Sequence, residues 1–346
     1  MRFNDITLLS ILNDYKIFQY SEVMRLLQEF QSVEKIFDAQ QKELEQFVSS
    51  SKVNKFIKFR DEFNFEPYYR MIRELSKKNV TILPFYHEKY PELLKTISNP
   101  PLVLFHKGSL LEFSNCIAVV GTRNLSHYGH KMARKLSQEL AQAGYTIVSG
   151  LARGTDTEAH CGALDVGGRT IAVLANNITE IYPPENEKLS SDIIKSGAIL
   201  SESTILKKLN KSNFVLRNRI TSGLSKCVVV IESGNKRGTS HQVKIAHDQN
   251  KPIFLLKPIE LNSTSANDFN EFIELGAIPF TSSNEILSQI QDNGEIFKKN
   301  LEVVKDAPVT CEEWTVIPSK SNPSNSFISN KSPKKILNSR LEDFIK

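Results

Sequence analysis

Glycine-bearing turns with a basic side chain occur three times in the chain. They are Gly121-Thr122-Arg123, Gly150-Leu151-Ala152-Arg153-Gly154 and Lys236-Arg237-Gly238-Thr239. Glycine lets a backbone turn tightly, and the N-terminus of a following helix offers unpaired N–H groups to a phosphate. Each turn alone is also consistent with an ordinary strand-to-helix connection that exposes a cation. Three such turns on one sheet edge would form a phosphate-binding crevice, and the sequence predicts this site.

A basic stretch lies between the second and third turns. No Asp or Glu occurs from residue 203 to residue 231, whereas six basic residues do: Lys207, Lys208, Lys211, Arg217, Arg219 and Lys226. Asn213-Phe214 and Arg217-Asn218-Arg219 fall inside this stretch, and Phe214 and Arg217 would share one face of a helix. An aromatic ring that stacks on a base, beside cations that bind the backbone, is typical of single-stranded nucleic-acid sites. The alternative is an amphipathic helix with a buried Phe214 and solvated arginines.

Sequence motifs of several enzyme classes are missing. The turn at Gly121 does not follow GxGxxG and no GxxxxGK[ST] occurs, so neither a dinucleotide site nor a P-loop is predicted. The chain has no H-E-x-x-H and no cysteine pair at metal spacing, so we expect no metal and no cofactor. The four cysteines are interpreted as reduced thiols, which indicates a cytoplasmic protein.

Three polar residues beside the turns have more than one interpretation. Asp156 is expected to cap a helix, and His160 is expected to be a structural or exposed histidine. Glu232 follows an apolar run, where it would bind a ribose, act as a base or pair with an arginine. The loop Tyr182-Pro183-Pro184-Glu185-Asn186 is rigid because of its two prolines, and we expect it to be structural.

The segments that must position these residues alternate between apolar runs and helical patterns. Apolar runs rich in β-branched residues lie at 117–120, 145–148, 170–174, 198–200, 228–231 and 253–256. Helical patterns lie between most of them, at 129–143, 156–164, 187–195 and 240–248. Continuous apolar strands separated by helices indicate a parallel sheet covered on both faces. The predicted fold is therefore an α/β, extended Rossmann-like, doubly wound and mainly parallel sheet, whose ligands bind at the carboxyl ends of the strands.

Four segments are predicted along the chain. Residues 1–78 form a small helical domain, 79–114 a joint, 115–290 the Rossmann-like domain, and 291–346 a linker with a mostly disordered, Ser- and Asn-rich tail. No apolar run approaches the about 18 residues that a membrane span needs, and no secretory signal is visible. The 44 basic and 39 acidic residues give a net charge of only +5, so the acid-free stretch is the main basic feature.

In this order, the motifs resemble those of the DNA-processing protein family DprA (Smf). The resemblance rests on Gly121-Thr122-Arg123, on Ser149 to Asp156 with Ala159-His160, on Gly167-Gly168-Arg169-Thr170, on the Tyr182 loop, and on Asn213-Phe214 through Arg219. It covers about residues 80–290. The segment 1–78 departs from the family pattern because it lacks glycine, and no C-terminal winged helix is evident.

The resemblance implies a non-enzymatic, cytoplasmic homodimer that binds and protects single-stranded DNA and loads a RecA-type recombinase during natural transformation. It implies that Arg123 and Arg153 bind phosphates, and that Phe214 stacks on a base in a pocket lined by Lys211, Arg217 and Arg219. The full set of expected DNA-binding residues is Gly121, Thr122, Arg123, Gly150, Arg153, Gly154, Lys211, Asn213, Phe214, Arg217, Asn218, Arg219, Lys236, Arg237, Gly238 and Thr239. The alternative is a nucleotide-metabolising enzyme or a nucleotide-derivative sensor on a related scaffold, in which Glu232 would be the functional acid.

Overall fold

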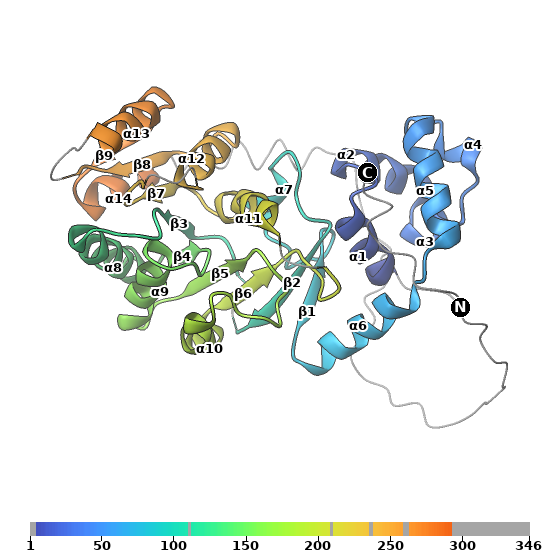
Figure 1. The fold of residues 1–346 in the computed structure, drawn as a ribbon, viewed down its shortest axis with the longest axis horizontal. Helices are drawn as coiled ribbons and strands as arrows, with labels where there is room; N and C mark the ends of the chain where they lie inside the picture. Colours follow the sequence, from blue (N-terminus) through green and yellow to red (C-terminus); the bar gives the residue numbers. More distant parts are fainter. Residues whose placement is uncertain (1–4, 110–111, 208–209, 235–237, 259–262, 293–346) are drawn as a thin grey trace. The chain divides into compact units, whose positions relative to one another are not determined.

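A nine-stranded sheet forms the centre of the protein. A computed structural model describes residues 5–109, 112–207, 210–234, 238–258 and 263–292. The sheet order is β1-β2-β6-β5-β4-β3-β7-β8-β9 (Figure 1). The strands are β1 (Thr81–Pro84), β2 (Val103–Gly108), β3 (Cys116–Val120), β4 (Thr146–Ser149), β5 (Thr170–Leu174), β6 (Ala198–Ser201), β7 (Val228–Val230), β8 (Ile253–Leu256) and β9 (Ile278–Phe280).

Strands β3 to β9 run parallel, and β2 pairs antiparallel with both β6 and β1. From β3 the chain proceeds outward through β4, β5 and β6, and then returns to β7 on the other side of β3. The order of the strands therefore reverses between β3 and β7. In an open parallel sheet, ligands bind outside the carboxyl ends of the strands at such a reversal.

Helices cover both faces of this sheet because alternate residues of each strand point to opposite faces. The helices of this part are α7 (Glu92–Lys95), α8 (His127–Gln142), α9 (Thr155–Asp165), the short 3-10 helix η1 (Pro184–Asn186), α10 (Glu187–Ser196), α11 (Lys211–Gly223), α12 (Gly238–Asp248), α13 (Ser263–Glu274) and α14 (Ser283–Asp292). Ile117 and Val119 pack against α8, α9 and α14, whereas Ala118 and Val120 pack against α12 and α13 (Figure 1).

The predicted doubly wound, mainly parallel α/β fold is confirmed. Each predicted strand and helix of this part is present, with ends that agree within two residues. The prediction succeeds because strands buried on both faces are continuously apolar. The strands β1 and β2 lie in the segment 79–114, so the sheet continues into the expected joint.

The N-terminal segment is helical, as predicted. Its helices are α1 (Asp5–Tyr15), α2 (Tyr20–Phe30), α3 (Val33–Asp38), α4 (Gln41–Leu44), α5 (Ser50–Glu62) and α6 (Glu66–Lys77). Leu9, Ile11, Leu26 and Phe56 are fully buried among them. Among the described residues, no helix is both long enough and apolar enough to cross a membrane. The expected linker and tail, residues 291–346, lie outside the described residues from 293 onward, and the domain boundaries stay a prediction.

Candidate functional site

The turns that follow β3 and β4 are joined by hydrogen bonds. The backbone N–H and the hydroxyl of Thr155 both donate to the carbonyl oxygen of Thr122, at 3.2 and 3.0 Å. A Cβ on Gly121 would lie 2.5 Å from Thr155 Oγ1, and a Cβ on Gly154, whose φ is +73°, would lie 2.5 Å from the Arg123 carbonyl oxygen. Both glycines are therefore required by the close approach of the two turns.

Arg123, Phe214 and Tyr182 form a cluster of one cation and two aromatic rings at these turns. The Arg123 guanidinium carbon lies 5.3 Å from the centroid of the Phe214 ring, and the Tyr182 ring meets Phe214 edge-on at 6.0 Å. Arg123 is exposed, Phe214 is half-buried and Tyr182 is 43% exposed. Together with Gly150, Arg153 and Asn176 they line a small depression. Accessible aromatic rings beside an arginine provide stacking faces for bases and charge for phosphates.

Sequence reasoning missed Tyr182. The two prolines that follow it led to a purely structural interpretation of its loop, and their rigidity does hold the loop. The loop nevertheless presents the Tyr182 ring to Phe214, about thirty residues further along the chain. The only available signal was the aromatic side chain itself, since its partner comes from a distant helix.

Arg217 is buried beside the turn after β4. Its side chain crosses over Gly150, and Nη1 donates to the Val173 carbonyl oxygen at 2.8 Å. Asp156 is also buried, and its Oδ2 accepts from the backbone N–H groups of Gly150 and Ala152, each at 3.1 Å. Burial raises the pKa of the Asp156 carboxyl, and the Arg217 cation acts in the opposite direction. Arg217 also lines a cavity of about 110 Å³ next to Phe214, to which it contributes positive charge.

Carboxylates occupy two of the three helix starts at which the sequence analysis expected a phosphate. Glu232 Oε2 accepts from the backbone N–H and the hydroxyl of Ser126, at 3.0 and 3.1 Å, and Ser126 Oγ caps α8 by accepting from Gly129 N–H. Asp156 Oδ2 accepts hydrogen bonds from two backbone N–H groups of the turn before α9. At these two helix starts, carboxylates of the protein therefore accept the hydrogen bonds that the sequence analysis expected a phosphate to accept.

The same contacts bear on the alternative that Glu232 is a catalytic acid or a ribose ligand. Its carboxylate accepts a hydrogen bond from Ser126 at the start of α8, and its backbone carbonyl oxygen accepts one from Thr122 N–H at 2.8 Å. Glu232 thus has a structural partner for both its side chain and its backbone. No observation in the described part of the chain favours a nucleotide-metabolising reaction at this residue.

The expectation that Arg219 lines the same pocket as Phe214 is wrong. Arg219 Nη2 pairs with Glu202 Oε2 at 2.6 Å, and Arg219 lines a different cavity with residues of α1 and α2. The reason is helical geometry, because five residues at about 100° per residue rotate Arg219 far from Phe214 around α11. Glu202, just before the acid-free stretch, neutralises part of its charge.

The other predicted residues differ in how they relate to the Arg123–Phe214 cluster. Arg153 is exposed, lines the small depression and pairs with Glu185. Lys211 is exposed at the start of α11 and lines neither the depression nor the 110 Å³ cavity, so the expectation that it lines the pocket of Phe214 is wrong. Asn213 is buried, and its backbone N–H donates to the side chain of Asn210, which caps α11. Asn218, Gly238 and Thr239 line the 110 Å³ cavity. Lys236 and Arg237 lie outside the described residues.

Comparison with known sequences identifies relatives for most of the α/β part. The family profile of DNA recombination-mediator protein A matches residues 81–291. Protein Smf of Synechocystis is 38% identical over 232 residues, which are 66% of this chain and 58% of that protein. DNA processing protein DprA of Bacillus subtilis is 35% identical over 225 residues, which are 64% of this chain and 75% of that protein. The match thus spans less than two thirds of the Synechocystis protein.

Solved structures give a consistent result. The X-ray structure of DNA processing protein A from Streptococcus pneumoniae has a TM-score of 0.70 and 25% identity, covering 83% of this chain and 98% of that chain. DNA processing protein A from Helicobacter pylori, described for its single-stranded DNA binding mode, has a TM-score of 0.55 and 29% identity, covering 62% of this chain and 96% of that chain.

Proposed function

Because the chain belongs to the DNA recombination-mediator protein A family, we propose that it binds single-stranded DNA at the carboxyl ends of β3 and β4. The observation that carries this proposal is the cluster of Arg123, Phe214 and Tyr182. Every base has a flat π-face, so stacking on Phe214 requires no particular sequence. Tyr182 offers a second exposed ring next to it for a neighbouring base.

The phosphates of the strand would be bound by exposed cations around this cluster. Arg123 and Arg153 lie in adjacent turns, and Lys211 lies at the start of the helix that carries Phe214. Arg153 pairs with Glu185 in the free protein, but both side chains are about half exposed, so a phosphate can replace this carboxylate at little cost. Arg217, which is largely buried and lines the 110 Å³ cavity next to Phe214, adds positive potential to the site.

The proposed cellular role is the one that the family resemblance implies. The protein would act by binding rather than by catalysis, would protect single strands, and would load a RecA-type recombinase during natural transformation. It would do so as a homodimer. The relative from Helicobacter pylori, whose structure is described for its single-stranded DNA binding mode, supports the first step of this role.

The test compares how tightly the protein binds labelled oligo(dT) and a matched duplex. Binding is measured by fluorescence anisotropy at about 50 and 200 mM salt. We expect preference for the single strand and a steep loss of affinity with salt, because phosphates contribute most of the binding energy. Phe214→Ala should weaken binding by about 1–3 kcal/mol, or roughly 5- to 150-fold, as for one stacked base. Arg123→Ala should weaken binding and also reduce the dependence on salt.

A second pair of an arginine and an aromatic ring provides a matched control. Arg73 lies 5.9 Å from the centroid of the Tyr69 ring on α6, away from the proposed site. Tyr69→Ala should leave oligo(dT) affinity unchanged. The proposal is overturned if Phe214→Ala and Arg123→Ala bind oligo(dT) as tightly as the natural protein, or if the protein prefers the duplex.

A further inference from the structure

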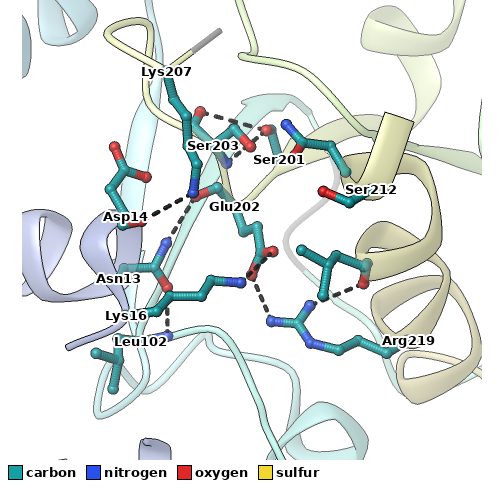
Figure 2. Close-up of polar contacts among 12 residues, drawn as sticks. Asn13, Asp14, Lys16, Leu102, Ser201, Glu202, Ser203, Lys207, Ser212 and Arg219 are labelled. Atoms are coloured by element: carbon teal, nitrogen blue, oxygen red, sulfur yellow. Dashed lines mark hydrogen bonds and ion pairs between the residues drawn. The ribbon is translucent and has the colours of Figure 1, made fainter. Parts of the chain in front are cut away.

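A buried polar cluster connects α1 to the end of β6 and to α11 (Figure 2). Its centre is Glu202, which pairs with Arg219 at 2.6 Å and with Lys16 at 3.4 Å. The side chains of Glu202 and Arg219 are only 11% and 12% exposed. The side chain of Asn13 donates to the Glu202 carbonyl oxygen at 2.8 Å and accepts from Leu102 N–H at 3.0 Å. This cluster fixes two cations at one place in the fold.

The second carboxylate of the cluster does not neutralise these cations. Asp14 Oδ2 accepts from the hydroxyls of Tyr68 and Thr204, and burial raises the pKa of this carboxyl. Lys207 Nζ donates to the Asp14 backbone carbonyl oxygen at 2.9 Å, and its positive charge also acts on the Asp14 carboxyl. Lys16 and Arg219 therefore share the single carboxylate of Glu202.

Two observations show that Lys16 and Arg219 retain capacity to bind an anion. The Lys16–Glu202 distance of 3.4 Å is long for a charged hydrogen bond. Arg219 Nη1 donates only a long hydrogen bond of 3.3 Å to the Leu216 carbonyl oxygen. Burial lowers the pKa of Lys16, the nearby cations Arg219 and Lys207 lower it further, and Glu202 acts in the opposite direction. Positive charge thus remains incompletely balanced here.

A cavity of about 300 Å³ lies beside these two cations, and both of them line it. This volume is at the lower end of the range of about 300–1,000 Å³ for small-molecule sites. One part of its wall is polar, with Gln19, Ser21 and Asn99 as possible hydrogen-bonding partners. The lining also includes the apolar side chains of Phe18 and Pro100 and the aromatic ring of Tyr20. The cavity therefore combines two cations with aromatic and apolar groups against which a planar ring can pack.

We propose that this cavity binds a mononucleotide, with its phosphate between Lys16 and Arg219 and its base against Tyr20 and Pro100. The phosphate monoester comes either from a free nucleotide or from the phosphorylated end of a DNA strand. The site differs from the Arg123–Phe214 cluster, because Arg219 faces away from Phe214 on α11. It extends the function beyond binding of the strand interior.

The test is isothermal titration of the full-length protein with dTMP, and with uncharged thymidine as a ligand control. Saturable binding of dTMP, and at least tenfold weaker binding of thymidine, is expected. Lys16→Gln is the preferred variant, because Lys16 is 36% exposed and its loss leaves Arg219 to balance Glu202. It should weaken dTMP binding at least tenfold, whereas Lys131→Gln, which removes an exposed lysine from α8, should not.

Phe214→Ala separates this site from the proposed DNA site, since it should weaken oligo(dT) binding and leave dTMP binding intact. The proposal is overturned if dTMP shows no saturable binding, if Lys16→Gln binds it normally, or if Phe214→Ala abolishes its binding. A 5′-phosphorylated oligo(dT) that binds more tightly than its 5′-hydroxyl counterpart, only while Lys16 is present, identifies the strand end as the source. Equal binding of the two oligonucleotides identifies the free nucleotide.

Discussion

The guanidinium of Arg217 occupies the space that a side chain at position 150 would need. A Cβ on Gly150 would lie 1.5 Å from Arg217 Nη1. The glycine at this turn thus admits an arginine of the protein rather than a phosphate of a ligand. Arg217 uses the space to reach the Val173 carbonyl oxygen and to lie close to the Asp156 carboxylate. This arrangement links β5, the turn after β4 and the helix that carries Phe214.

Gly150→Ala should therefore disturb both stability and DNA binding. The new methyl group would displace the Arg217 side chain and leave the Val173 carbonyl oxygen without its donor. A buried polar group that loses its partner costs about 1–3 kcal/mol, so the free energy of unfolding should fall by that amount. Oligo(dT) affinity should fall as well, because α11 and the turn lose their contact. Urea denaturation and fluorescence anisotropy measure the two effects.

Gly238→Ala provides the control for the stability measurement. A Cβ at Gly238 would meet no atom of the described residues within 4 Å, and Gly238 is the first residue of α12. Alanine is the better helix former, so this change should leave stability unchanged or raise it slightly. The account of Arg217 is contradicted if Gly150→Ala unfolds at the same urea concentration as the natural protein.

The strands and helices around the sheet were predictable because their signals are local. The run Val228–Val230 is apolar in itself, whatever its neighbours are, and the following glycine-bearing turn marks its end. Phe214 and Arg217 were correctly placed on one helix for the same reason. These properties depend on spacing along a short segment, which the sequence contains.

The partners of the charged residues were not predictable, because they depend on tertiary structure. Arg219 pairs with Glu202 only because β6 ends beside α11, and Glu232 reaches Ser126 only because β7 lies next to β3. A sequence shows that a stretch lacks acids, but it does not show which distant carboxylate folds against it. The same limit hid the contact between Tyr182 and Phe214.

Glu232→Gln should destabilise the protein with little effect on its fold. The Glu232 carboxylate lies at the N-terminus of α8, where the helix dipole favours a negative charge, and it accepts two hydrogen bonds from Ser126. Glutamine keeps the size but loses the charge, which should lower the free energy of unfolding by about 1 kcal/mol. Thermal or urea denaturation at low salt measures this loss.

Glu271→Gln is the matched control for that variant, since Glu271 pairs with Lys244 and both side chains are about half exposed. Exposed ion pairs contribute little, so its effect should be smaller. If both variants lower the free energy of unfolding equally, Glu232 does not stabilise the start of α8. A base-release assay with nucleoside monophosphates belongs to the same experiment, because turnover that disappears in Glu232→Gln would instead support the enzymatic alternative.

His160 should make folding stability depend on pH in a defined direction. The side chain is fully buried, and its Nδ1 lies 2.7 Å from Thr170 Oγ1, whose own proton goes to the Ile147 carbonyl oxygen. Nδ1 of His160 therefore donates to Thr170 Oγ1. Burial lowers the pKa of His160 to about 3, with a smaller contribution from the Arg217 cation. Only the unfolded chain binds this proton readily near pH 6.

The stabilising contribution is thus complete above a pH of about 6.5, the usual pKa of an unfolded histidine, and is lost progressively as the pH falls toward 3. The slope is about 1.4 kcal/mol per pH unit, so the natural protein should lose about 1.4 kcal/mol from this group between pH 7.5 and 5.5. His160→Asn retains an N–H donor for Thr170 but cannot titrate, so it should lack this part of the loss in urea denaturation. His241→Asn, which removes an exposed imidazole, should lose as much stability on acidification as the natural protein. If His160→Asn loses as much stability on acidification as the natural protein, His160 is not the group responsible.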